Sequence, residues 1–159
     1  MPIHFNAIAT DHARHIQTGG KDANGQMAER RLSSGSGTPC RHCLQYIKAG
    51  EAYLIAAYRP FQTIQPYAET GPIFLHAALC QRAEPDDDLP AILDGPDFIL
   101  RGYDGDERIV SGTGAVIARS GIKKRAEALL LRDDIVFVDI RSARNNCFLC
   151  RVQFLQENF

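Results

Sequence analysis

A chain of 159 residues, of which 45% are hydrophobic, is long enough for one ordinary domain with a core of its own. Its formal net charge of −1 argues against nucleic acid or an anionic membrane as the main partner. No apolar run approaches the roughly 20 residues of a membrane-spanning helix, which argues against a membrane protein.

The N-terminus and the cysteines bear on the compartment. The first residues, Met-Pro-Ile-His-Phe-Asn, lack the charged start and the long apolar middle of a signal peptide. Five cysteines is an odd number, which fits poorly with a closed disulfide framework. We therefore expect a cytoplasmic protein whose thiols are reduced.

The first part of the chain predicts few regular elements. Residues 3–8 alternate weakly between apolar and polar and predict a strand, and residues 10–16 predict a short helical turn. His12 and His15 on that turn are interpreted as a solvated surface pair. Residues 19–37 are rich in Gly, Ser, Asn and charged residues, so we expect a flexible loop there, unusually long for a compact domain.

Residues 39–48 predict a short helix. Thr38 is a favourable N-cap, and Pro39 is a favourable first helical residue because its missing N–H would be unpaired there in any case. Gly50 would end the helix, since glycine readily adopts the left-handed conformation found after a helix C-terminus. The cysteines of this segment would then lie at the start of a helix.

The rest of the chain predicts a largely antiparallel sheet. An amphipathic helix is expected over residues 122–132, and strands over residues 52–58, 73–76, 98–103, 108–118, 135–140 and 147–155. The turn residues 104–106 join two of these strands into a hairpin. Because strands follow strands in the sequence, we expect an α+β fold, with a mainly antiparallel sheet and two or three short helices, in a single domain over residues 1–159.

Four side chains are candidates for one metal site: Cys40, Cys43, His76 and Cys80. The Cys-x2-Cys spacing lets two thiolates reach one ion from a single turn. His76 and Cys80 are four residues apart, and residues at that spacing share a face of a helix or a strand. Three cysteines and one histidine form a standard closed structural zinc site, so zinc is the expected cofactor. His42, inside the first pair, is an alternative ligand to Cys40.

The first cysteine pair also resembles a known zinc-binding motif. Cys40-x2-Cys-x3-Ile-x2-Gly-Glu51 is similar to the first knuckle of treble-clef zinc fingers, which also close with histidine and cysteine. In those fingers the residues of the closing pair are more often two apart, whereas three residues intervene between His76 and Cys80.

Two other interpretations of these residues remain open. The plainest is that they belong to the core, because free cysteine is among the most buried residue types. The other is a thiol redox protein that uses Cys40 and Cys43, because a helix N-terminus lowers the pKa of a cysteine at its start. The segment before Cys40 does not, however, predict the buried strand that such a motif follows. Cys147 and Cys150, three apart in an expected strand, would point to opposite faces and share no ligand.

Polar residues in a loop and at strand ends are candidates for ligand binding: Arg59, Arg101, Tyr103, Arg141 and Asn146. Binding residues favour such positions on a rigid scaffold, and guanidinium groups suit carboxylate and phosphate, so the three arginines would form an anion-binding cluster. The alternative is ordinary ion pairing of these arginines with Glu69, Asp104 and Asp139.

An enzyme acting on a small anionic substrate is a further hypothesis. Its pocket would be lined by His76, Glu69 and Tyr67, with His76 as the general base and Arg59 holding the substrate. The sequence contains no serine nucleophile motif, Walker loop or dinucleotide-binding fingerprint that would name a reaction.

Several motifs occur in an order that resembles a known family. They are Pro39-Cys-Arg-His-Cys-Leu44, Gly50-Glu51, Tyr58-Arg-Pro-Phe61, Pro66-Tyr67, Gly71-Pro-Ile-Phe-Leu-His76, Leu100-Arg-Gly-Tyr-Asp104, Gly112-Thr-Gly114 and Arg141-Ser-Ala-Arg-Asn-Asn-Cys-Phe148. From about Pro39 onward the chain resembles a bacterial family catalogued as a domain of unknown function, number 1203. The resemblance implies a bacterial protein and a site among these motifs rather than in residues 19–37, but it lends no catalytic residue.

The leading hypothesis is therefore a small bacterial cytoplasmic protein that acts as a metal-containing binding or interaction module through a Cys/His site. The enzyme and the thiol redox protein are the alternatives. Neither a membrane nor nucleic acid is expected as a partner.

Overall fold

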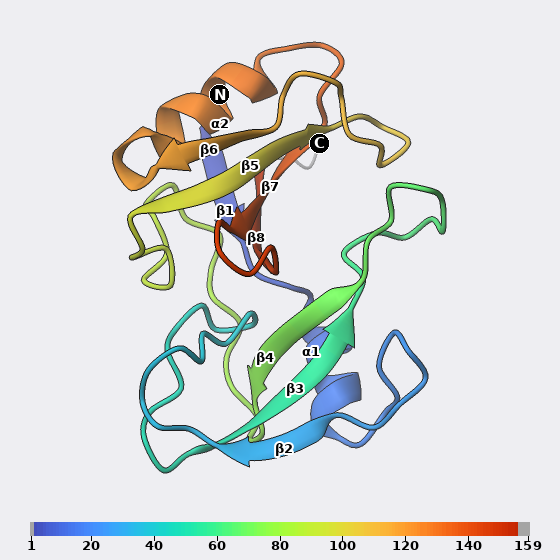
Figure 1. The fold of residues 1–159 in the computed structure, drawn as a ribbon, viewed down its shortest axis with the longest axis vertical. Coiled ribbons are helices and arrows are strands. Elements are labelled where there is room, and N and C mark those ends of the chain that lie inside the picture. The colour runs from blue at the N-terminus through green and yellow to red at the C-terminus, as the bar shows by residue number, and fades with distance from the viewer. Residues whose placement is uncertain (1, 156–159) are drawn as a thin grey trace.

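Residues 2–155, which the computed structural model describes, form two lobes that are each built on an antiparallel sheet (Figure 1). The five-stranded lobe has the strand order β1 (Ile3–Asn6), β8 (Phe148–Phe154), β7 (Phe137–Ser142), β5 (Asp97–Tyr103) and β6 (Ala115–Ala118). The three-stranded lobe has the order β2 (Glu29–Leu32), β3 (Ala52–Tyr58) and β4 (Gly71–His76). The expected α+β fold with mainly antiparallel sheet is confirmed.

Two α-helices complete the described part of the chain, one on each lobe. Helix α2 (Ile122–Leu130) follows the 3-10 turn η1 (Arg119–Gly121) and packs its apolar side on the five-stranded sheet, as its pattern predicts. Helix α1 (Thr10–Gln17) packs Ala13 and Ile16 against the three-stranded sheet. Neither helix is long and apolar enough to span a membrane.

The five-stranded sheet has an apolar face and a polar face. Phe98 and Leu100 of β5 share the core with α2, because alternate strand residues point to the same side. The other side carries a row of polar residues that are paired across four strands: Asn6, Arg151, Asp139 and Arg101. Side chains at directly paired positions lie side by side, so this row crosses the sheet on the face away from α2.

The expected helix over residues 39–48 is wrong. The segment is a hairpin-like loop, residues 38–47, which we call the knuckle loop. The N–H of Cys40 donates to the carbonyl of Gln45 at 2.9 Å, and the N–H of Ile47 donates to the carbonyl of Thr38 at 3.0 Å. The Thr38 hydroxyl bonds to the Ser33 hydroxyl at 2.8 Å and therefore caps no helix.

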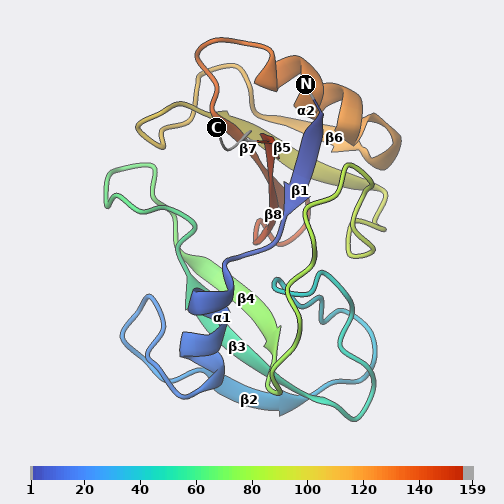
Figure 2. The same cartoon turned by 180° about the vertical axis from the view of Figure 1, so that it is seen from behind.

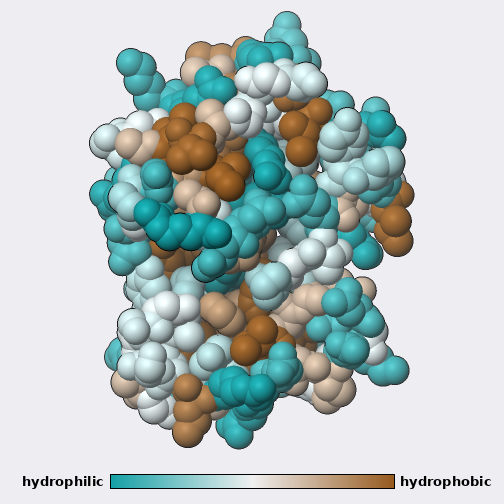
Figure 3. Space-filling view, viewed as in Figure 1, coloured by the Kyte–Doolittle hydropathy of each residue, from teal (hydrophilic) through white to brown (hydrophobic). Residues whose placement is uncertain are grey.

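Part of the expected loop at residues 19–37 is a strand. β2 pairs with β3, with Glu29 opposite Ile55 and Leu32 opposite Ala52. All four of its residues are exposed, so no alternation of apolar and polar residues indicates it in the sequence. On the face of the molecule that Figure 3 shows, apolar side chains gather in small separate groups among hydrophilic ones.

The knuckle loop joins the two lobes. The buried Arg41 donates from Nε to the carbonyl of Phe148 in β8 at 2.7 Å and from Nη2 to Cys147 Sγ at 3.3 Å. Leu44 belongs to the core of the five-stranded lobe, whereas Cys40 and Ile47 belong to the core of the three-stranded lobe. One short loop therefore contributes to both cores.

Candidate metal centre

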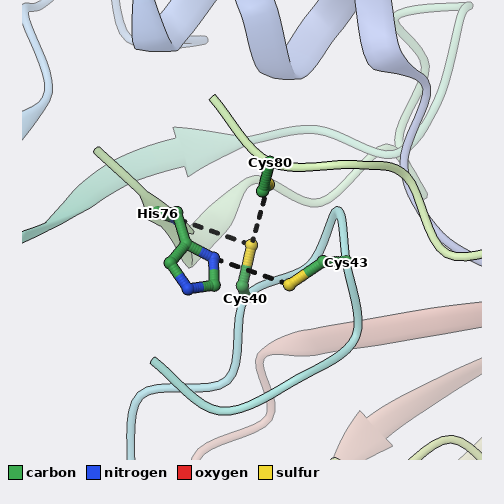
Figure 4. A group of neighbouring side chains, drawn as sticks. All are labelled: Cys40, Cys43, His76 and Cys80. Carbon is green, nitrogen blue, oxygen red and sulfur yellow. Dashed lines mark hydrogen bonds between the residues drawn. The ribbon is translucent and has the colours of Figure 1, made fainter. Parts of the chain in front are cut away.

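The structure brings together the four side chains that the sequence predicts as ligands. Cys40 and Cys43 come from the knuckle loop, His76 ends β4, and Cys80 follows in a segment with no regular structure (Figure 4). One ligand atom from each residue lies within 4.8 Å of the others. The prediction placed His76 and Cys80 on one face of a single helix or strand. The structure brings them together although β4 ends at His76 and Cys80 lies in irregular chain.

The knuckle loop reaches His76 because it lies along β4. β3 occupies one edge of β4, and Cys40 forms a parallel bridge with Phe74 on β4. The N–H of Arg41 donates to the carbonyl of Phe74 at 3.0 Å, and the N–H of His76 donates to Cys40 Sγ at 3.4 Å. Main-chain contacts therefore fix the two halves of the cluster relative to each other.

Two separations within the cluster agree with tetrahedral coordination of zinc. Cys40 Sγ lies 3.9 Å from Cys80 Sγ, and Cys43 Sγ lies 3.5 Å from His76 Nδ1. With zinc–sulfur bonds of about 2.3 Å and zinc–nitrogen bonds of about 2.0 Å, tetrahedral geometry sets these separations at roughly 3.8 Å and roughly 3.5 Å. The residues present therefore fit a zinc ion.

The second ring nitrogen of His76 faces a carboxylate. Its Nε2 lies 3.4 Å from Glu51 Oε2, while its Nδ1 faces the cysteines. Histidines that bind metals commonly donate their second ring N–H to a carboxylate, which fixes the tautomer and the ring orientation. Glu51 is placed to act as this carboxylate. The Gly50-Glu51 motif in the sequence does not indicate a contact with His76.

His42, expected as an alternative ligand, instead contacts Cys80 from outside the cluster. Its Nδ1 lies 3.1 Å from Cys80 Sγ, and its Nε2 lies 2.9 Å from the Thr10 hydroxyl on α1. An Nδ1–H donor to a Cys80 thiolate leaves Nε2 free to accept from Thr10. The chain of hydrogen bonds thus orients a cysteine ligand and holds the buried imidazole.

Helix α1 supplies a second set of supporting contacts. Arg14 Nη2 donates to the carbonyl of Cys80 at 2.6 Å. Gln17 Nε2 donates to the carbonyl of His76 at 2.9 Å and lies 3.7 Å from Cys80 Sγ. With Thr10, these residues form a polar stripe at helical spacing, since positions four and seven apart share a face. That spacing is the signal in the sequence that could have identified them.

The thiols of the cluster have unequal acidity. The pKa of Cys40 is lowered to about 4, chiefly by a hydrogen bond from the Cys43 thiol and further by backbone N–H donors, against the opposing effect of burial. The same hydrogen bond, together with burial, raises the pKa of Cys43, and burial raises the pKa of Cys80. No helix begins at Cys40, so the helix-terminus argument for a thiol redox protein does not apply, and Cys40 is fully buried.

A pocket of about 700 Å³ lies beside the cluster and is lined by Gln17, Glu51, His76 and Cys80 among others. His76 and Cys80 thus lie on the side of the cluster that faces this pocket, whereas Cys40 and Cys43 do not line it.

Two of the three arginines predicted to bind anions lie together. Arg101 Nη1 and Arg141 Nη1 lie 3.3 and 3.5 Å from the two carboxylate oxygens of Glu69. Asn146 accepts from both arginines, through its side chain and its main-chain carbonyl. Glu69 is thus their ion-pair partner, whereas Asp139 pairs with Arg151 and Asp104 Oδ1 accepts from the backbone of its own turn.

Tyr103 lies beside this pair, whereas Arg59 does not. The Tyr103 side chain is fully buried, with its ring stacked on Phe137 at a centroid distance of 4.9 Å. Burial raises the pKa of its hydroxyl, and the nearby Arg101 and Arg141 act in the opposite direction. Arg59 lines a different pocket, between the lobes.

The pocket expected for an enzyme is not assembled. His76 lies in the Cys/His cluster, Glu69 lies between two arginines, and Arg59 lines the pocket between the lobes. The ring of Tyr67 lies 5.5 Å from the guanidinium of Arg108. The structure therefore gives no single site in which His76 would act as a general base on a substrate held by Arg59.

Comparison with known proteins identifies a family and nothing narrower. A family model described as "Protein of unknown function (DUF1203)" matches residues 37–153, which confirms the resemblance drawn from the motifs. No curated protein and no solved structure matches the chain significantly. The matched range contains all four cluster residues.

Proposed function

This chain belongs to the DUF1203 family of proteins of unknown function, and from that premise we propose that it is a binding or interaction module with a structural zinc centre. Cys40, Cys43, His76 and Cys80 would be the ligands. The observation that carries the proposal is the spacing of their ligand atoms, all within 4.8 Å of one another. Two contacts from outside the cluster, from Glu51 to His76 and from His42 to Cys80, support the proposal.

The role of the ion would be structural. Four protein ligands fill a tetrahedral shell and leave no position for water or substrate, which is typical of structural zinc sites. The ion would connect the knuckle loop, the end of β4 and the segment that contains Cys80. All five cysteines are free thiols. The bacterial cytoplasm that the sequence predicts would keep them reduced and available to a metal.

Elemental analysis of the purified protein tests the proposal. We expect one zinc ion per chain, lost in both Cys43→Ser and His76→Ala because each removes a ligand. Cys147→Ser and His15→Ala are matched controls outside the cluster and should keep the ion. Cobalt substitution should give the visible absorption of tetrahedral thiolate coordination. A metal-free protein, or a Cys43→Ser protein that retains its zinc, would show that the cluster is not a metal site.

A further inference from the structure

A second site lies between the two lobes, in a pocket of about 420 Å³. Most of its walls come from four parts of the chain: the link between β1 and α1, helix α1 itself, the end of β3 with the loop after it, and β8. Figure 2 shows the link from β1 running between the lobes to α1. Arg82, just after Cys80, adds a fifth wall. The pocket has the size of ordinary small-molecule sites.

The polar lining of this pocket is basic. Arg59, Arg82, Arg151 and His12 line it, and no carboxylate does. Asp139 neutralises Arg151, with contacts of 2.7 and 3.0 Å to the guanidinium. Within residues 2–155, neither Arg59 nor Arg82 has a carboxylate oxygen within 4.0 Å. Arg59 and Arg82 therefore bring two positive charges to the lining without a carboxylate partner, although Nη2 of Arg82 donates to the carbonyl of Ala7 at 2.7 Å.

Hydrogen-bond donors in the lining also lack acceptors. Arg59 Nε and Arg82 Nε are buried N–H donors that have no partner in the described structure. The ring nitrogen Nε2 of His12 is also buried without a partner, and it donates or accepts according to the tautomer. A buried N–H that is left without an acceptor is costly, and most so when the group is charged. The sequence predicts a solvated surface position for His12, but its ring packs edge-on against Tyr58 with centroids 4.9 Å apart. These groups indicate that an acceptor belongs in the pocket.

The remaining lining offers a hydroxyl group and an apolar wall. Burial raises the pKa of Tyr58 to about 12, so its hydroxyl remains protonated at neutral pH and can donate. Ile8, Phe61 and Phe148 contribute apolar surface beside the arginines. A ligand with an anionic head and a small apolar body matches both parts.

We propose that this pocket binds the phosphate group of a small organic molecule, with Arg59 and Arg82 as the charged donors. The donors come from different walls, and the oxygens of a tetrahedral phosphate accept from several directions, whereas a carboxylate accepts within one plane. The two charges of a phosphate monoester match the two uncompensated guanidinium groups. The proposal does not depend on the zinc centre.

Calorimetric titration of the protein as purified tests it with phenyl phosphate, benzoate and phenol. We expect phenyl phosphate to bind, inorganic phosphate to compete with it, benzoate to bind more weakly and phenol not to bind. Failure of phenyl phosphate to bind a folded protein overturns the proposal. Equal binding of benzoate overturns the choice of phosphate over carboxylate.

Variants locate the site. Arg59→Gln and Arg82→Gln should each weaken phenyl phosphate binding at least about tenfold, because each removes a charge-assisted donor. Arg132→Gln removes an exposed arginine that pairs with Asp134, and should have no effect. Arg59→Lys retains the charge without Nε–H and provides a second test if the glutamine variant does not fold. Unchanged affinity in folded Arg59 and Arg82 variants overturns the proposal. Zinc content is measured in parallel, so failure of either site is distinguishable.

Discussion

Leu44 lies in the left-handed region, with a φ of 56°, and its side chain is buried in the core of the five-stranded lobe. A non-glycine residue in this region carries strain of about 1 kcal/mol or more, because its Cβ approaches the neighbouring carbonyl. The turn that brings Cys40 and Cys43 together requires this conformation immediately after the second cysteine. The residue thus combines a strained backbone with a favourable side-chain contact.

This combination predicts an unusual order of stabilities. Leu44→Ala should lower the free energy of unfolding by about 2–5 kcal/mol, as expected for a buried leucine. Leu44→Gly should be no less stable than Leu44→Ala, because glycine relieves the strain at positive φ. Urea unfolding of the zinc-loaded protein measures both values. At Leu54, a buried residue of β3, the glycine variant should be less stable than the alanine variant. If Leu44→Gly is likewise less stable than Leu44→Ala, the argument for strain at Leu44 is contradicted.

The sequence identified the four residues of the Cys/His cluster better than the residues that contact them from outside. Cysteine spacing is a local pattern, so Cys40 and Cys43 could be recognised without a fold. Glu51 and His42 act through contacts with residues far along the chain, and nothing near them in the sequence indicates those contacts. Arg59 was expected to hold an anion, but its neighbours in the pocket were not the ones expected.

Helix α1 contacts both sides of the cluster through its polar stripe. Thr10 bonds to His42 of the knuckle loop, whereas Arg14 and Gln17 donate to the carbonyls of Cys80 and His76. Its apolar residues, Ala13 and Ile16, attach the helix to the three-stranded sheet. A helix of eight residues is not stable alone, so its packing and these hydrogen bonds keep it ordered. The helix and the Cys/His cluster should therefore support each other.

We predict that Arg14→Ala weakens zinc binding by about tenfold, since contacts outside the ligand shell typically contribute 10–100-fold to metal affinity. The variant loses the bond to the Cys80 carbonyl but retains all four ligands, so it should still take up zinc at saturation. Competition with a chromophoric chelator measures the affinity. His15→Ala, on the next residue of the same helix, is the control. An equal loss in both variants would indicate a general effect on the helix.

The prediction of a helix over residues 39–48 is wrong because the rules for local helix formation take no account of long-range contacts. Thr38 and Pro39 suit a helix start, yet both belong to a loop whose hydrogen bonds pair its two sides. Leu44 at positive φ ends any helical run there. The contact of this loop with β4 joins segments more than thirty residues apart, and no periodicity of either segment encodes it. The strongly periodic α2 was predicted because its own pattern determines its packing.

We propose that the two lobes form one domain. The knuckle loop contributes to both cores, and Arg41 bonds it to β8. The zinc-loaded protein should therefore unfold in a single thermal transition that is the same by circular dichroism and by tyrosine fluorescence. Two separate transitions would indicate two independent domains.

Removal of the metal should affect the lobes unequally. All four ligands belong to the three-stranded lobe and its loops, whereas the five-stranded lobe has its own core with α2. After chelation we expect amide hydrogen exchange to accelerate in β3, β4 and the knuckle loop, while β5 and β7 remain protected. Uniform acceleration across both sheets would contradict this division.

The segment after β4 has a further consequence. Cys80 is a ligand of the proposed metal centre, and Arg82, two residues on, faces the pocket between the lobes. The N–H of Ala83 donates to the carbonyl of His42 at 2.9 Å, which ties the segment to the knuckle loop. If the ion fixes this segment, zinc and the phosphate ligand are thermodynamically linked. Whatever factor zinc adds to the affinity for the ligand, the ligand must add to the affinity for zinc.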